Sequence, residues 1–297
     1  MNNTHLTQWQ KRIIVQTEMA LNHYLPTDNQ SPEILHQAMR YASLGGGKRL
    51  RAMLVVAAAE LGKYDETAVS QAIAAVEMIH AYSLIHDDLP CMDDDDLRRG
   101  KPSCHKAFDE AQALLAGDAL QTLAFEVLAM DNALPAFQRL QSIQTLAQAS
   151  GSCGMAGGQS IDLSAVGSFP DLSSLENMHR LKTGALIRAS VRLGGLTCHS
   201  PDKDILLKLD SYANDLGLAF QVVDDILDTQ VDSQTLGKTA GKDANNGKPT
   251  FVSLMGIDAA EKYAKTLCDR AIQTVQNISA NTEILQTMAK FVLQRKC

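Results

Sequence analysis

The sequence predicts an all-α protein, a bundle of long helices. Apolar residues recur at helical spacing along almost the whole chain, and no segment shows the strict apolar–polar alternation that is typical of strands. The clearest stripe lies in residues 209–227, where apolar side chains repeat at intervals of three, four and seven positions. The members of this stripe are Leu209, Tyr212, Leu216, Phe220, Val223 and Leu227.

Breaks between the helices are expected where glycine, serine and proline gather. These clusters lie near residues 44–47, 98–103, 164–173, 194–202 and 237–250, and they leave helical segments mostly longer than a dozen residues. Long helices with short connections pack as a bundle. No change of composition and no linker divides the chain, so we expect one domain over residues 1–297.

Composition excludes several classes of protein. Hydrophobic residues make up 45% of the chain, enough for a large core, and the six cysteines form no CxxC pair, which argues against a zinc cage or a disulfide framework. The first residues lack the apolar core of a signal peptide, and no stretch reads as a membrane span, so a cytoplasmic protein is expected. A net charge of -7 argues against a nucleic-acid partner.

The strongest chemical feature is the segment LIHDDLPCMDDDDLRRG at residues 84–100. Six aspartates lie within ten residues of one another: Asp87, Asp88, Asp93, Asp94, Asp95 and Asp96. Carboxylates this close repel one another, so bound cations are expected to neutralise them, and Mg²⁺ prefers such oxygen ligands. The alternative is a solvated acidic loop. An EF-hand is excluded because its glycine and terminal glutamate are missing.

A second acidic group lies in QVVDDILD at residues 221–228. Asp224 and Asp228 are four positions apart and Gln221 is three positions before Asp224, so the three side chains share one helical face. Apolar residues occupy the other face. Two acidic groups on two helices favour a polynuclear metal site, and a helix cap or surface pair is the alternative.

Basic residues supply the complementary charge. The segment GGGKRLR at residues 45–51 places Lys48, Arg49 and Arg51 directly after three glycines, an arrangement that can bring backbone N–H groups and cations to phosphate oxygens. Three further lysines lie beside glycine or threonine: Lys182, Lys238 and Lys248.

Other chemistries find less support. A P-loop at residues 237–239 fails because Asp232 stands where its first glycine is required. No nucleophile elbow is present, and Gly151, Gly154 and the following glycines do not match a dinucleotide fingerprint. His80 lies seven residues before Asp87, on nearly the same helical face, and is either a ligand-facing or a structural histidine.

Together these motifs resemble the trans-prenyltransferases, or polyprenyl synthases, and among them the bacterial farnesyl diphosphate synthases (geranyltranstransferases). The resemblance extends from about residue 35 to the end of the chain. It rests on six motifs in order: GGGKRLR, DDLPCMD (87–93), RRG (98–100), GGQSIDL (157–163), LKTGAL (181–186) and FQVVDDILD (220–228).

The resemblance implies a helical bundle around a deep central cavity, and it implies a role for each matching residue. The metal ligands would be Asp87, Asp93 and Asp224, supported by Asp88 and Asp228, holding three Mg²⁺ ions, with Mn²⁺ as a possible substitute. Partners of the allylic diphosphate would be Arg98, Lys182 and Lys238. The isopentenyl diphosphate pocket would comprise Lys48, Arg51, His80 and Arg99, with Lys248 of less certain role. Thr183 and Gln221 would face the developing carbocation.

The implied reaction is the Mg²⁺-dependent head-to-tail condensation of isopentenyl diphosphate with dimethylallyl and geranyl diphosphate, giving (E,E)-farnesyl diphosphate and diphosphate. Alternatives are a geranyl or geranylgeranyl diphosphate synthase, a terpene cyclase or head-to-head condensing enzyme, a non-catalytic subunit of a heteromeric prenyltransferase, and a divalent-cation buffer. The separate basic pocket argues against a cyclase, and the complete aspartate sets argue against a silent subunit. The resemblance also suggests a homodimer.

Product length is expected to depend on residues just before Asp87. Ser83 and Tyr82 precede it by four and five positions, or about 6–7.5 Å of helix. Ideal helix angles favour Ser83 as the residue below the metals, whereas the resemblance points to Tyr82 as the floor that stops growth at fifteen carbons. Ordinary core packing of Tyr82 is the alternative.

Overall fold

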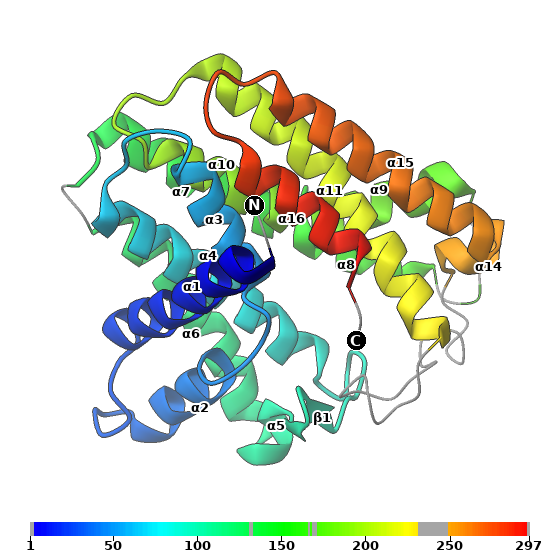
Figure 1. The fold of residues 1–297 in the computed structure, drawn as a ribbon. Coiled ribbons are helices and arrows are strands. Elements are labelled where there is room, and N and C mark those ends of the chain that lie inside the picture. Colours follow the sequence, from blue (N-terminus) through cyan, green and yellow to red (C-terminus); the bar gives the residue numbers. More distant parts are fainter. Residues whose placement is uncertain (1–2, 131–132, 166, 168–170, 231–248, 296–297) are drawn as a thin grey trace.

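The computed structural model describes residues 3–130, 133–165, 167, 171–230 and 249–295. Within these ranges nearly all the regular secondary structure is helical, which confirms the predicted class (Figure 1). The longer helices are α1 (Asn3–Tyr24), α4 (Glu66–Asp87), α6 (Glu110–Ala129), α7 (Ala136–Ser150), α10 (Ala185–Leu196), α11 (Lys203–Gln230) and α15 (Ile257–Gln276). The shorter ones are α2 (Glu33–Ser43), α3 (Leu50–Ala59), α5 (Cys104–Ala107), α8 (Met155–Ser164), α9 (Leu172–His179), α14 (Phe251–Met255) and α16 (Glu283–Leu293).

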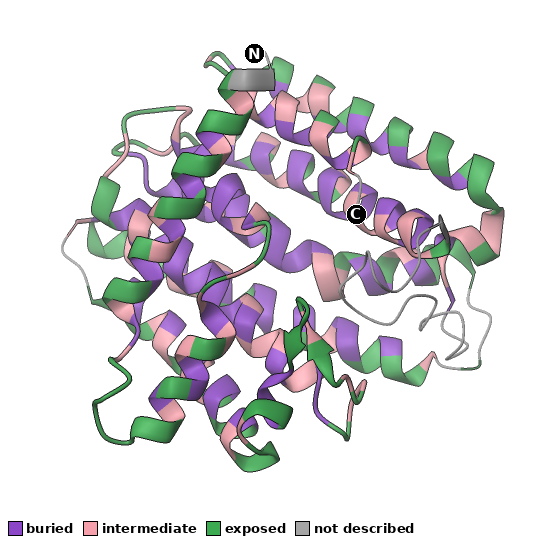
Figure 2. Cartoon of the chain, turned by 60° about the horizontal axis from the view of Figure 1, so that its bottom comes forward, coloured by how far each residue is buried: buried purple, intermediate pink, exposed green. Residues whose placement is uncertain are grey.

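Helix α4 lies at the centre of the bundle and carries the first acidic motif at its C-terminal end. It packs against α6, α3, α1 and α10, and most of its length is buried (Figure 2). Asp65 caps its start, because the carboxylate accepts a hydrogen bond from the N–H of Ala68 at 2.9 Å. The helix ends at Asp87, so the bundle core fixes the position of the aspartates.

Helix α4 is also long and apolar. By length and composition alone it could cross a membrane. However, 72% of its most apolar window is buried against other helices, as a central helix of a bundle requires.

Helix α11 carries the second acidic motif and confirms the apolar stripe. Leu209, Tyr212 and Leu216 are fully buried, and the helix packs along α15 and α10. The Tyr212 hydroxyl donates a hydrogen bond to the backbone carbonyl of Leu285 at 2.8 Å, which ties α11 to α16. The stripe therefore faces the core, and the polar residues of the same helix remain available to a cavity.

Two of the expected breaks differ in detail. Residues 98–103 include a short antiparallel hairpin of β1 (Leu97–Arg98) and β2 (Lys101–Pro102), whose turn residues Arg99 and Gly100 both have positive φ. Near residue 194, α10 continues through two glycines to Leu196. Gly194 lies within the helix, and its role is close packing of α10 on α3. A Cβ at this position would lie 2.1 Å from the carbonyl oxygen of Val55.

Candidate active site

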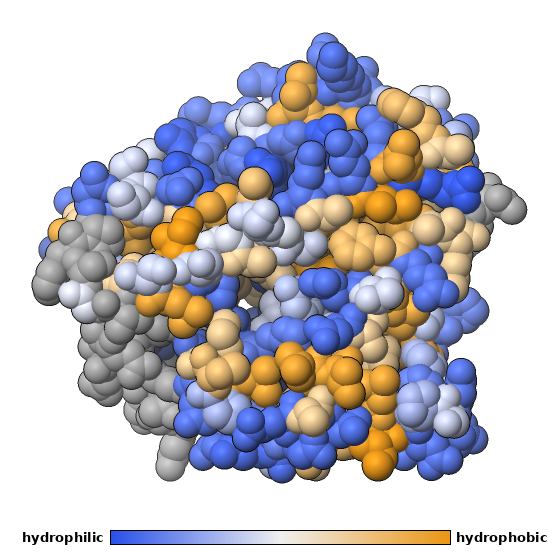
Figure 3. Space-filling model, turned by 180° about the vertical axis from the view of Figure 1, so that it is seen from behind, coloured by the Kyte–Doolittle hydropathy of each residue, from blue (hydrophilic) through white to orange (hydrophobic). Residues whose placement is uncertain are grey.

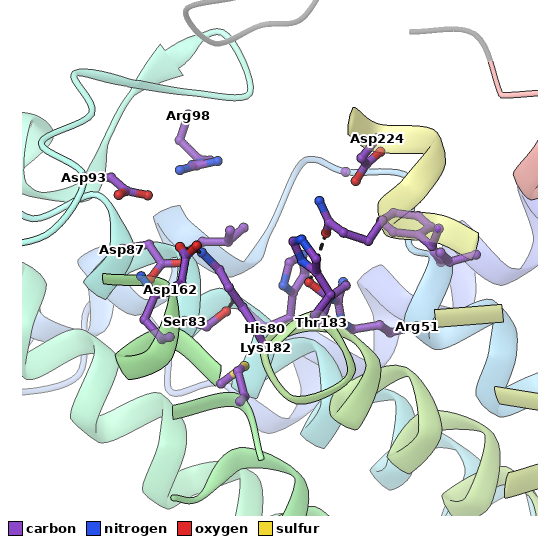
Figure 4. Close-up of a pocket in the computed structure, with 18 of the residues that line it drawn as sticks. Arg51, His80, Ser83, Asp87, Asp93, Arg98, Asp162, Lys182, Thr183 and Asp224 are labelled. Atoms are coloured by element: carbon purple, nitrogen blue, oxygen red, sulfur yellow. Dashed lines mark hydrogen bonds and ion pairs between the residues drawn. The ribbon is translucent and has the colours of Figure 1, made fainter. Parts of the chain in front are cut away.

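A cavity of about 780 Å³ lies between the C-terminal end of α4, α8, the N-terminal end of α3 and α11 (Figure 4). Most of the predicted site residues line it: Lys48, Arg51, His80, Tyr82, Ser83, Asp87, Asp93, Arg98, Arg99, Lys182, Thr183, Gln221, Asp224 and Asp228. Lys238 and Lys248 lie outside the described residues. Asp88 is described but does not line this cavity.

One wall carries Asp87 and Asp93. The loop after α4 folds back on itself, because the N–H of Asp93 donates to the carbonyl of Asp87 at 2.9 Å. Burial raises the pKa of Asp87 to about 6, the cation of Lys182 opposes the shift, and the negative charge of Asp93 adds to it. A carboxylate that burial makes costly to ionise would gain most from a bound cation.

Asp88, which the resemblance gives a supporting role at the metal site, lies beside Arg98. Its carboxylate is buried and accepts hydrogen bonds from the guanidinium of Arg98, with both oxygens 3.1 Å from Nε. Asp95 lies 3.6 Å from the same guanidinium and Asp96 pairs with Lys106 at 2.9 Å. The dense acidic run is therefore divided: Asp88 contacts Arg98 without lining the cavity, whereas Asp95 contacts Arg98 and also lines it.

The opposite wall carries Asp224 on α11, across the cavity from Asp87 and Asp93 (Figure 4). Arg295 pairs with Asp224 at 2.9 Å, and its guanidinium lies 4.1 Å from the centre of the Phe220 ring. Arg295 was not predicted as a site residue. The only sequence feature that marks it is the basic pair of Arg295 and Lys296 near the end of the chain.

The carboxylates do not form a closed metal cage by themselves. In the described part of the chain, no three acidic, histidine or cysteine side chains are grouped closely enough to hold an ion alone. Hard carboxylate oxygens on two facing walls nevertheless suit Mg²⁺, which normally keeps several waters and substrate phosphates among its ligands. The donor set fits a metal that is bound together with a diphosphate.

Lys182 and Thr183 lie on a single π-helical turn, η1 (Arg180–Gly184), between α9 and α10. π-helical turns are rare in proteins, and those that occur are often found at functional sites. Lys182 donates to the buried carboxylate of Asp162 at 2.7 Å. The turn can approach α8 because Gly158 has no side chain, and a Cβ there would lie 2.1 Å from the backbone nitrogen of Lys182. Asp162 lies in the motif GGQSIDL (157–163), but no role was predicted for it.

Thr183 and Gln221 both line the cavity and contact each other there. The Thr183 hydroxyl donates to the Gln221 side-chain oxygen at 3.3 Å, and the Gln221 amide donates to Asp225 at 2.9 Å. The other oxygen of Asp225 accepts the N–H of Phe251 at 2.8 Å. This chain of hydrogen bonds fixes the amide orientation, so the oxygens of Thr183 and Gln221 are held beside the cavity.

Two buried polar side chains on the same side of the cavity have no hydrogen-bond partner among the described residues. These are Gln159 on α8 and His179 on α9, and both line the cavity. Burial lowers the pKa of His179 to about 4, so its ring is neutral near pH 7. Neither residue was singled out in the sequence, because an isolated glutamine or histidine in a helix carries no distinctive pattern.

The basic end of the cavity contains Lys48, Arg51, His80 and Arg99. Burial and then the cations of Arg51 and Arg99 lower the pKa of His80 well below its usual value. Burial also lowers the pKa of Arg51, with the Arg99 charge contributing, although Glu77 opposes both effects. Cations that destabilise one another in a buried pocket would be stabilised by a bound anion.

Tyr82 and Ser83 both line the cavity below Asp87. The Tyr82 ring makes an edge-to-face contact with His86 at 5.2 Å, and Ser83 donates to the carbonyl of His80 at 2.9 Å. Helix α4 is uninterrupted here, so no distortion is needed for Tyr82 to reach the cavity. Ideal angles alone favoured Ser83 because they ignored the length of the tyrosine side chain.

The sequence matches a known protein family over most of its length. The polyprenyl synthetase family model matches residues 32–289. The farnesyl diphosphate synthase of Escherichia coli is 48% identical over 289 residues, covering 95% of this chain and 96% of that protein.

Solved structures give the same result. The FPP/GFPP synthase of Zymomonas mobilis superposes with a TM-score of 0.89 at 41% identity, covering 98% of this chain and 100% of that one. A geranyltransferase of Helicobacter pylori, complexed with magnesium and isoprenyl diphosphate, superposes with a TM-score of 0.86 at 32% identity, covering 99% and 98%.

Proposed function

Since the chain belongs to the polyprenyl synthetase family, we propose that it condenses isopentenyl diphosphate with dimethylallyl and then geranyl diphosphate to give farnesyl diphosphate. The observation that carries the proposal is the division of one cavity. Carboxylates on facing walls suit a metal-bound diphosphate, and a separate group of cations suits a second diphosphate that binds directly. A protein that only buffers cations, or one that takes a single diphosphate, has no need of both.

Asp87, Asp93, Asp224 and Asp228 would hold the magnesium, with three ions expected and Mn²⁺ as a possible substitute. When bound, Mg²⁺ would neutralise the negative charge that develops on the allylic diphosphate as its C–O bond breaks. Lys182 would add a cation on the same side, and Asp162 would hold that lysine in place until the diphosphate arrives.

Arg98 would contact the same diphosphate. Its guanidinium is oriented by the buried Asp88, which supports a positioning role for that aspartate in place of metal ligation. Lys238, and less certainly Lys248, are proposed as further cationic partners on the strength of the resemblance alone.

Isopentenyl diphosphate would bind at the basic end, through Lys48, Arg51, His80 and Arg99. Its double bond would attack C1 of the allylic cation to form the new C–C bond, and C2 would then lose H⁺ while the C–H electron pair stays and forms the new double bond. The Thr183 and Gln221 oxygens would face the positive charge during this step. We propose that the released diphosphate takes the proton, because none of the sequence motifs supplies a dedicated base.

A homodimer is proposed from a surface feature as well as from the resemblance. The rear face of the molecule carries patches of apolar side chains (Figure 3). Exposed apolar residues on the neighbouring helices α6 and α7 include Leu114, Leu115, Phe137 and Leu140. Burying such side chains in a symmetric interface would be favourable. A cytoplasmic location is proposed because each cysteine in the described part of the chain is a free thiol.

The test is to incubate purified protein with Mg²⁺, isopentenyl diphosphate and either dimethylallyl or geranyl diphosphate, and to measure the length of the product chain. A fifteen-carbon product supports the proposal. Products that stop at ten or reach twenty carbons assign the alternative synthases, and metal binding without any product assigns the cation buffer.

A further inference from the structure

One arginine of the basic loop behaves differently from its neighbours. Arg49 lies between Lys48 and Arg51, yet its side chain is 2% exposed and forms a buried ion pair. It has a φ of +50°, a left-handed conformation that is uncommon for a residue with a side chain. Backbone strain of this kind persists only where surrounding contacts compensate for it.

The compensating contacts come from three different parts of the chain. Nη1 of Arg49 donates to Glu77 of α4 at 2.9 Å, and Nη2 donates to Glu18 of α1 at 2.6 Å. Nη2 also donates to the carbonyl of Ser43, the last residue of α2, at 2.7 Å. The guanidinium therefore joins three helices at the base of the glycine loop.

The two glutamates also fix the backbone on both sides of that loop. The second oxygen of Glu18 accepts the N–H of Gly45, the first of the three glycines, at 3.1 Å. The second oxygen of Glu77 accepts the N–H of Ala52 at 3.2 Å, just after Arg51. Each carboxylate thus holds one end of residues 45–52 and the arginine between them.

The network also acts on the charges of the pocket. The negative charge of Glu77 stabilises the protonated forms of Arg51 and Arg99, and Glu18 adds to this effect at Arg99. Two carboxylates and one guanidinium leave one excess negative charge beside the cationic cluster. This charge keeps the cations together before an anion binds.

We propose that Glu18, Arg49 and Glu77 form a positioning network that holds residues 45–52 in the shape that binds the non-ionising diphosphate. Affinity for that substrate then depends on three residues that need not touch it. The identity of the substrate rests on the proposed function, whereas the effect on diphosphate affinity does not.

The test compares Glu18→Gln with Glu60→Gln. Glu60 is a matched control: it also links α1 to α3, through Arg12 at 2.7 Å and Trp9 at 3.1 Å, and its side chain is 26% exposed, against 30% for Glu18. Steady-state kinetics with each substrate varied in turn should show that Glu18→Gln raises KM for isopentenyl diphosphate by at least about fivefold. Both kcat and KM for geranyl diphosphate should stay within about twofold of wild type.

Two further variants separate positioning from folding. Arg49→Met should raise the same KM further, and Arg49→Lys should recover part of the loss because it restores the charge but not the fork of donors. Parallel changes in both KM values, or a Glu18→Gln variant that behaves like Glu60→Gln, would overturn the proposal.

A binding experiment distinguishes failure of the network from failure of the proposed function. If wild-type protein forms no product, the proposed function is wrong, and titration with inorganic diphosphate still tests the network. The network predicts weaker binding by Glu18→Gln than by wild type or Glu60→Gln, and equal binding by all three would refute it.

Discussion

Replacing Tyr82 by alanine should lengthen the product. If the growing chain is held at its diphosphate end near Asp87, it should extend along α4 toward Tyr82, about 7.5 Å away in helical rise. The tyrosine ring is braced by His86, whose Nε2 lies 3.0 Å from the carbonyl oxygen of Leu114. His86 fits against α6 because a Cβ at Gly117 would lie 2.2 Å from Nε2. We therefore expect Tyr82 to act as a rigid floor, and its removal should open the cavity.

The structure sets the expected cost of this change. Truncating a fully buried aromatic residue costs about 3–5 kcal/mol, and Tyr82 is only half-buried, so a loss of about 1–2 kcal/mol is expected. For a protein of this size that corresponds to a fall in Tm of about 2–6 °C, which leaves the protein folded at assay temperature.

The assay is the product length from geranyl diphosphate and excess isopentenyl diphosphate. Tyr82→Ala should give mainly products of twenty carbons or more, and Ser83→Phe should shorten the product toward ten. Tyr24→Ala is the control, since Tyr24 is also half-buried and contacts a histidine, His23, edge to face at 4.7 Å, but lies on α1. A folded, active Tyr82→Ala that still stops at fifteen carbons would refute the floor assignment.

Three further predictions follow from the site. Asp87→Ala and Asp224→Ala should each abolish turnover while circular dichroism stays helical, with exposed Asp204→Ala as control; substantial activity at saturating Mg²⁺ would contradict the metal assignment. Arg99→Gln should raise KM for isopentenyl diphosphate, and a selective loss of geranyl diphosphate affinity would reverse the two pockets. The pKa of His179 falls to about 4 in the folded state, so its stabilising contribution is present above pH 6.5 and is lost as pH falls toward 4. Between pH 6.5 and pH 4 the free energy of unfolding of wild type should fall by about 3 kcal/mol more than that of His179→Gln, as measured by denaturant unfolding. Equal falls in the two proteins would contradict this.

The periodic spacing of apolar and polar residues predicted the helices and the faces that they bury. The stripe through Leu209, Tyr212 and Leu216 gave the helix and its buried face, and the spacing of Gln221 and Asp224 gave the cavity face of the same helix. The hairpin at residues 97–102 was missed because each strand has two residues, too few to show alternation.

Contacts between distant segments were beyond such reasoning. Asp88 looks identical to Asp87 in the sequence, and only the packing of the hairpin against α4 turns Asp88 toward Arg98. Arg49 looks like a third phosphate-binding cation until Glu18 and Glu77 are brought beside it. The pairing of Lys182 with Asp162 likewise depends on the close approach of η1 to α8.

The division of the cavity into a metal-dependent and a metal-independent diphosphate site is tested most directly by equilibrium binding. The affinities for geranyl diphosphate and for isopentenyl diphosphate would be measured separately, with Mg²⁺ and with excess chelator. Chelation should weaken geranyl diphosphate binding by at least about tenfold, the equivalent of one lost metal contact, and should change isopentenyl diphosphate binding by less than about threefold. Equal loss of both affinities, or no loss of either, would contradict the account.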